Sequence, residues 1–147
     1  MKVSLPVHEH PPEPDWGRIT AVLTGIGAPV TVATHDGLAL TYHDMAQEMA
    51  EGLASATPSL LNQSLTLGGL LGKGKPEDVL IRLAARQGWL IFSPATACTA
   101  LVTLVGPGQG VDQANARISK AVDALEGLLP SSLPDRVGRM RVYRSVA

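Results

Sequence analysis

A glycine-rich segment contains the residues whose spacing comes nearest to a catalytic motif. Residues 69–76 read GLLGKGKP, which fits a phosphate-binding P-loop as far as its Gly-Lys pair. Pro76 stands where that motif needs the Ser or Thr hydroxyl that holds magnesium, and proline also lacks a backbone donor. No strand-like run leads into the segment from residues 63–67. We therefore expect a glycine-rich loop over residues 67–76 and no nucleotide site.

Two histidines near the amino terminus are the next candidates, as metal ligands. His8 and His10 flank Glu9 and could hold zinc or copper loosely, but a protein metal site needs three or four convergent ligands. The sequence contains neither a Cys-x-x-Cys nor a His-Glu-x-x-His pattern. We therefore expect no metal site and no cofactor.

Nucleophilic catalysis has equally little support. The single cysteine, Cys98, begins a strand-like run, and no nearby base is spaced to activate it. It cannot form an intrachain disulfide, and we expect a small buried hydrophobic residue. His35 and His43 flank a turn and a helix start, where we expect surface or capping roles. These patterns predict that the chain is not an enzyme.

An arginine cluster near the carboxyl terminus is a candidate docking site for a partner. It comprises Arg136, Arg139, Arg141 and Arg144, beside Tyr143. The formal net charge is −1 and only 3% of residues are aromatic, so the chain lacks the field and the stacking platform that nucleic acid requires. We expect a solvated tail, with docking to an acidic protein as the alternative.

The composition sets the domain organisation that must position these residues. With 147 residues, 45% of them hydrophobic and 17% charged, the chain can bury a core and fold. We predict a proline-rich arm over residues 1–14, one domain over residues 15–130 and an arginine-containing tail over residues 131–147. No run is long or apolar enough to span a membrane, and the arm has no signal-peptide pattern. We expect a cytoplasmic protein.

The first half of the domain predicts a helix, a hairpin and a second helix. Asp15 can cap a helix that ends near Gly25. The strand-like runs 30–34 and 38–42 enclose Asp36-Gly37, which favours a hairpin with a primed turn. Asp44 and Gln47 resemble a capping box that opens a helix over residues 44–61. Pro58 predicts a kink or a break in that helix.

The second half predicts three strands and a last helix. Residues 79–83, 89–92 and 99–105 are apolar runs rich in strand-forming side chains, which predicts an antiparallel meander. Apolar residues then recur at helical spacing over 111–129 until Pro130 ends the helix. The tail allows one short edge strand. The fold class is therefore α/β (α+β), in the order α-β-β-α-β-β-β-α.

The second predicted helix is more apolar than a helix that covers one sheet face requires. Met45, Met49 and Leu53 form a stripe, and small residues such as Ala50 and Gly52 occupy other faces. The stripe is either the ordinary core face or an interface between subunits. The scarcity of charge on this helix suggests a second contact.

The element order, together with the run VTVATHDGLAL at residues 30–40, resembles the Roadblock/LC7 family and its prokaryotic, MglB-like members. The resemblance covers residues 15–130. It implies profilin-like layers: a five-stranded antiparallel sheet, one long Ala-rich helix on one face, and the first and last helices on the other. The family has no catalytic motif to transfer.

The resemblance also implies a homodimer in which the second helices pack together and the third strands pair edge to edge. In this chain the interface would comprise Met45, Met49, Gly52, Leu53, Ala56, Val79, Ile81 and Leu83. Such pairing would remove an aggregation-prone sheet edge.

Family members act by binding, often to a Ras-like small GTPase, so the resemblance implies a non-catalytic dimeric regulator or scaffold of such a GTPase. Two alternatives keep the same fold. One is a structural adaptor subunit of a larger complex or sensor kinase system, docked by its tail and arm. The other is a small-ligand sensor, which would need a pocket.

Overall fold

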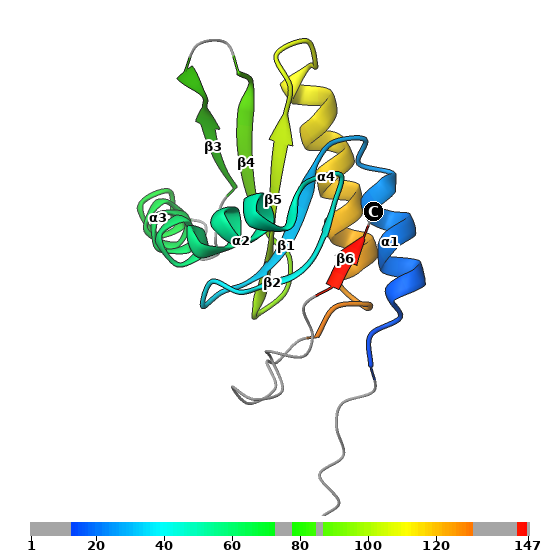
Figure 1. Cartoon of the computed structure of the whole chain (residues 1–147). Helices are drawn as coiled ribbons and strands as arrows, with labels where there is room; N and C mark the ends of the chain where they lie inside the picture. The colour runs from blue at the N-terminus through cyan, green and yellow to red at the C-terminus, as the bar shows by residue number, and fades with distance from the viewer. Residues whose placement is uncertain (1–12, 73–77, 85–86, 131–143, 147) are drawn as a thin grey trace, which may run out of the picture.

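The computed structural model describes residues 13–72, 78–84, 87–130 and 144–146. The elements are α1 (Trp16–Thr24), β1 (Val30–Thr34), β2 (Ala39–His43), α2 (Gln47–Ser55), α3 (Thr57–Leu70), β3 (Val79–Arg82), β4 (Trp89–Pro94), β5 (Thr99–Val105), α4 (Val111–Leu125) and β6 (Arg144–Val146). One sheet has the strand order β3-β4-β5-β1-β2-β6. α2 and α3 cover one face and α1 and α4 cover the other (Figure 1). The predicted layers are confirmed.

β1 and β2 form the predicted hairpin, but with a different turn. Gly37 has a φ of 101° while Asp36 has no positive φ, so the primed turn was wrong. The Gly37 amide donates to the Thr34 carbonyl at 3.0 Å, and the Thr34 amide donates to the Leu38 carbonyl at 2.8 Å. The Thr34 hydroxyl donates to Asp36 Oδ1 at 2.5 Å and accepts from the Leu38 amide at 2.9 Å. A three-residue loop with glycine last fits this geometry.

The predicted long helix is two helices, α2 and α3, which meet at Ala56. Pro58 lies in the first turn of α3, where its missing amide costs nothing, so the predicted break is confirmed. The loop predicted from Leu67 is wrong at its start, because α3 continues to Leu70. Gly68 is buried in that last turn, where the absence of a side chain allows close packing.

The predicted capping box is also wrong. Asp44 has a φ of 57°, which turns the chain sharply between β2 and α2. The helix begins at Gln47, and Ala46, its N-cap residue, provides no side-chain hydrogen bond. The side-chain amide of Gln47, Nε2, instead donates to Glu51 Oε1 at 3.0 Å, one turn along the helix surface.

The meander β3-β4-β5 is antiparallel throughout, and β5 joins it to the hairpin through antiparallel pairing with β1. A sixth strand, β6, pairs in parallel with β2, with Arg144 opposite Thr41 and Val146 opposite His43. The five predicted antiparallel strands are therefore present, and β6 adds one short parallel strand at the edge.

The core is divided between the two sheet faces. The larger cluster lies beneath α1 and α4 and includes Ile19, Leu23, Ile118 and Leu125, all at most 1% exposed. The smaller cluster joins α3 to the meander through Leu60, Val79, Phe92, Ala100 and Val102. The α2 side is thinner, because alanines alone form the cluster there.

Candidate functional site

The outward side of α2 is the centre of the candidate site. Ala50 and Ala54 are fully buried against the sheet, whereas Met49 is 51% exposed. Of the two roles that the sequence left open for this stripe, the core face is therefore excluded for Met49. The helix lies close to the sheet because its inward side chains are single methyl groups, and this leaves the longer Met49 side chain outside.

Met45 differs from Met49 in where it lies. It precedes α2, is half-buried, and its Sδ accepts a hydrogen bond from the Thr31 hydroxyl at 2.9 Å. Thr31 lies on β1 and is fully buried. Met45 is therefore held against the sheet. Of the two methionines, only Met49 belongs to the exposed side of α2.

A hollow of about 560 Å³ opens beside α2 and brings together three residues of the predicted interface, Met49, Leu53 and Leu83. Leu90 of β4 and Leu104 of β5 also line it. These five side chains come from α2 and from the meander, and all are apolar. Asp44, Gln87 and Gln109 also line the hollow, so it is mainly rather than wholly apolar, and the described part of the chain leaves it open.

The meander also places an open sheet edge on the same side of the molecule. β3 is the terminal strand of the sheet, and nothing in the described ranges pairs with its outer edge. Leu80 is 42% exposed and Ile81 37% exposed, while Val79 is only 8% exposed. An unpaired strand with exposed apolar side chains is a template for pairing with a second chain. Val79 belongs to the core instead.

Two small residues complete the exposed side of α2 and its junction with α3. Gly52 and Ala56 are both exposed, and a Cβ on Gly52 would meet no atom within 4 Å. Glycine inside a helix costs about 0.5–1 kcal/mol relative to alanine. Packing within one chain does not explain why a glycine occupies this position.

The arginine cluster lies largely outside the described residues. Arg136, Arg139 and Arg141 are in the undescribed stretch 131–143, and Arg144 begins β6. A docking role for these four arginines therefore stays a prediction.

The remaining candidates for chemistry are structural or fall outside the described residues. Cys98 is buried, as predicted, and its thiol donates to the Pro130 carbonyl at 3.1 Å. Burial raises the pKa of this thiol above 9.0, and nearby Asp36 adds to the rise, while a hydrogen bond from Thr96 opposes it. This environment disfavours a thiolate nucleophile. His35 Nε2 lies 3.2 Å from the Thr99 carbonyl oxygen, which fixes its ring.

No group of three His, Cys, Asp or Glu side chains within the described ranges could hold a metal ion. His8, His10, Lys73 and Lys75 lie outside those ranges. None of the helices that the structure describes is both long and apolar enough to cross a membrane.

Sequence reasoning missed one feature, the exposed leucines of α3 and the residue after it. Leu65, Leu67, Leu70 and Leu71 are 42–78% exposed. α3 packs on the meander through the face that carries Leu60, Ser64 and Gly68, all buried. Leu60, Ser64 and Gly68 are spaced four residues apart, and this spacing could have predicted that the helix continues. The two glycines that follow Leu67 favoured a loop instead.

Comparison with known proteins shows that the fold of this chain is similar to that of several solved structures. The sequence matches no protein-family model and no curated protein. Among solved structures, Myxococcus xanthus MglB matches with a TM-score of 0.67 at 20% identity, over 83% of this chain and 95% of that one. A Roadblock/LC7 domain from Streptomyces avermitilis matches with a TM-score of 0.63 at 19% identity, over 77% of this chain and 94% of that one.

The gliding protein MglB from Thermus thermophilus also matches, with a TM-score of 0.65 at 17% identity, over 77% of this chain and 89% of that one. These likenesses agree with the element order and layers described above. The chain has the Roadblock/LC7 fold of the MglB type.

Proposed function

We propose that this chain, built on the Roadblock/LC7 fold, is a non-catalytic regulator or scaffold of a Ras-like small GTPase that works as a homodimer. The observation that carries the proposal is the apolar surface formed by α2 and the β3 edge, with Met49 at its centre and 51% exposed. A second copy of the chain is the partner whose surface has matching chemistry.

Self-association would use both parts of this surface. Two β3 strands that meet across a twofold axis would satisfy each other's free amides and carbonyls. The same axis would bring two α2 helices together, and Gly52 and Ala56 would let their backbones approach closely. Each exposed Met49 could then fill apolar space beside the facing helix, including the hollow next to Leu53 and Leu83.

The proposed GTPase partner follows from the resemblance to the Roadblock/LC7 family. Regulation without catalysis requires only that the protein bind one nucleotide state more tightly than the other, because that difference shifts the equilibrium between the states. The arginine tail is a proposed additional contact for an acidic region of such a partner.

The first experiment measures solution mass by light-scattering chromatography. Met49→Asp places a charge where the proposed interface becomes buried and unpaired, which disfavours association strongly. Ser119→Asp is the matched control, because Ser119 is exposed on α4, which covers the opposite face of the sheet. We expect a dimer for the wild type and for Ser119→Asp, and a folded monomer for Met49→Asp. A folded monomer in all three proteins would contradict the proposed homodimer.

The second experiment tests the partner. Wild-type protein is titrated with cognate small GTPases, including any encoded nearby, each loaded with GDP or with a non-hydrolysable GTP analogue. We expect binding to one GTPase to differ between the two nucleotides, and to weaken in Met49→Asp if the bound surface spans both protomers. Equal binding in both states, or none to any GTPase, would count against regulation.

A further inference from the structure

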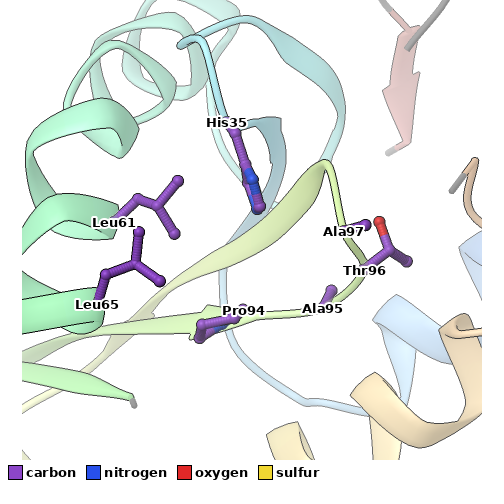
Figure 2. A pocket seen from close by; sticks show the side chains of 7 residues that line it. All are labelled: His35, Leu61, Leu65, Pro94, Ala95, Thr96 and Ala97. Atoms are coloured by element: carbon purple, nitrogen blue, oxygen red, sulfur yellow. The ribbon is translucent and has the colours of Figure 1, made fainter. Parts of the chain in front are cut away.

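A second apolar cavity lies beside α3. It measures about 400 Å³ and lies between Leu61 and Leu65 of α3, His35 of the hairpin and the β4–β5 turn at residues 94–97. Figure 2 shows the two leucine side chains and the imidazole pointing into the shared space. None of the described residues that line it is Asp, Glu, Lys or Arg.

The walls of this cavity are fixed by hydrogen bonds. The imidazole of His35 lies 3.2 Å from the Thr99 carbonyl oxygen. The Thr96 hydroxyl lies 2.6 Å from the Thr99 hydroxyl and donates to the Pro130 carbonyl at 3.0 Å. Leu65 nevertheless remains 50% exposed at the rim. The cavity is thus a preformed apolar site that the described residues leave open.

We propose that the amino-terminal arm of the same chain docks in this cavity through residues 3–7. These residues read VSLPV, an uncharged run in which apolar side chains alternate as they do in an extended chain. Alternation directs Val3, Leu5 and Val7 to one side. Leu5 at the centre of the run enters the space beside Leu65, and Pro6 favours the extended backbone that this requires.

The place where the described chain begins supports this occupant. The start of α1 lies at the end of the sheet that also carries the hairpin tip and the β4–β5 turn (Figure 1). Trp16 of α1 and Ala95 of the cavity wall pack against the same core cluster. Leu5 lies eight residues before Glu13, a stretch that can span about 27 Å when extended. The arm therefore starts from the end of the sheet at which the β4–β5 turn lines the cavity.

The charge pattern favours the arm over the other nearby segment. Residues 131–143 follow Pro130, whose carbonyl accepts a hydrogen bond from Thr96 at the cavity wall. That segment carries Asp135 and three arginines among its apolar residues, and an apolar cavity without a countercharge disfavours burial of such side chains. Residues 3–7 bring no charge.

Limited proteolysis of the full chain tests the proposal from the cavity side. A glutamate-specific protease cleaves after Glu9 only when the arm is free, and mass spectrometry follows the release of residues 1–9. Leu65→Asp should raise the cleavage rate by at least about tenfold, because proteolysis follows the fraction of free arm and the docked leucine loses its apolar contact. Leu70→Asp is the control, since Leu70 lies on the same helix, is 78% exposed and does not line the cavity.

The outcomes separate the possible occupants. Equal cleavage in the wild type, Leu65→Asp and Leu70→Asp would overturn the proposal. If Leu65→Asp instead exposes Arg136 to Arg141 to trypsin while cleavage after Glu9 is unchanged, residues 131–143 occupy the cavity and the proposal is wrong. Protection of Glu9 that disappears on dilution would assign the arm to a second copy, which also contradicts docking within one chain.

A second measurement tests the proposal from the arm side, in case Leu65→Asp perturbs α3. Leu5→Asp should shift the backbone NMR signals of His35, Leu65 and residues 95–97, whereas Lys2→Asp, outside the apolar run, should leave them in place. Signals that are the same in the wild type and in Leu5→Asp would show that the arm is not docked, and would overturn the proposal.

Discussion

Gly88, in the β3–β4 turn, lies directly against the carbonyl of Val105 at the end of β5. A Cβ on Gly88 would be 1.9 Å from the Val105 carbonyl oxygen, and Gly88 has a φ of +102°. Both the close approach and the backbone conformation therefore exclude any side chain at this position. The contact lies where β4 begins, because Trp89, the next residue, is paired with Val105 of β5.

The first prediction concerns this contact. Gly88→Ala should lower the free energy of unfolding by about 2–4 kcal/mol, because the backbone strain and the steric clash add together. Urea denaturation followed by circular dichroism measures the change. Gly106→Ala is the control, since a Cβ there meets no atom within 4 Å. Equal midpoints for Gly88→Ala and the wild type would contradict the close approach.

The second prediction separates stability within one chain from association. Gly52→Ala should raise the stability of the monomer by about 0.5–1 kcal/mol, because alanine favours the helix and the added methyl group meets no atom of the chain. In the proposed dimer the same methyl group would keep the two α2 helices apart, so the dimer should dissociate more readily. Denaturation at low protein concentration and sedimentation equilibrium measure the two effects.

Gly69→Ala provides the comparison, because Gly69 is also helical, and a Cβ there meets nothing within 4 Å. Gly69→Ala should raise the stability of the monomer in the same way, but it should leave the dissociation constant of the dimer unchanged. If Gly52→Ala also leaves the dimer unchanged, the α2 helices do not approach each other at this residue.

The third prediction concerns the open sheet edge. Ile81→Lys places a charge on β3 at a side chain that is already 37% exposed, so the fold should tolerate it. Lysine on an edge strand opposes pairing with another strand, and the proposed dimer should weaken by at least about tenfold in its dissociation constant. Sedimentation measures this constant. Ala116→Lys, exposed on α4, should leave it unchanged, and equal weakening by both variants would point to net charge instead.

The fourth prediction follows from Cys98. Burial raises the pKa of its thiol above 9.0, so the native thiol should react with a disulfide reagent at pH 8 at least about tenfold more slowly than the thiol of urea-unfolded protein. The folded state binds this proton more tightly than the unfolded state, so stability should fall as the pH rises above 9.0 toward the folded pKa. Cys98→Ala should abolish that pH dependence. A native thiol as reactive as the unfolded one would contradict burial.

The strands were predictable where the local sequence alone determines them. β1 and β5 have the predicted bounds, since Pro29 precedes one run and Gly106 ends the other. The meander and the hairpin were likewise predicted, because their apolar runs are separated by turn residues at short distances.

The side of α2 that faces inward was not predictable in the same way. Side-chain size favours Met49 for the core over Ala50, but the helix lies too close to the sheet for the longer side chain, and that distance is a property of the assembled layers. The extent of α3 has a similar cause. Gly68 lowers helix propensity in any context, and its burial against the meander outweighs that cost.

The candidate site was predicted mainly through the resemblance. Met49, Leu53 and Leu83 do line one hollow, while Met45 and Val79 are held by contacts within the chain. The cavity beside Leu65 was missed, because it forms between a helix, a hairpin and a turn that are distant in the sequence.

The two edge strands of the sheet differ, because β3 exposes Leu80 and Ile81, whereas β6 is only three residues long and begins with Arg144. If two chains join through β3, the joined sheet ends in β6 on both sides, where a short strand that begins with a charged residue disfavours pairing with a third chain. A filament needs an interface that repeats without closing. A chain whose two sheet edges differ in this way favours a closed pair over a filament.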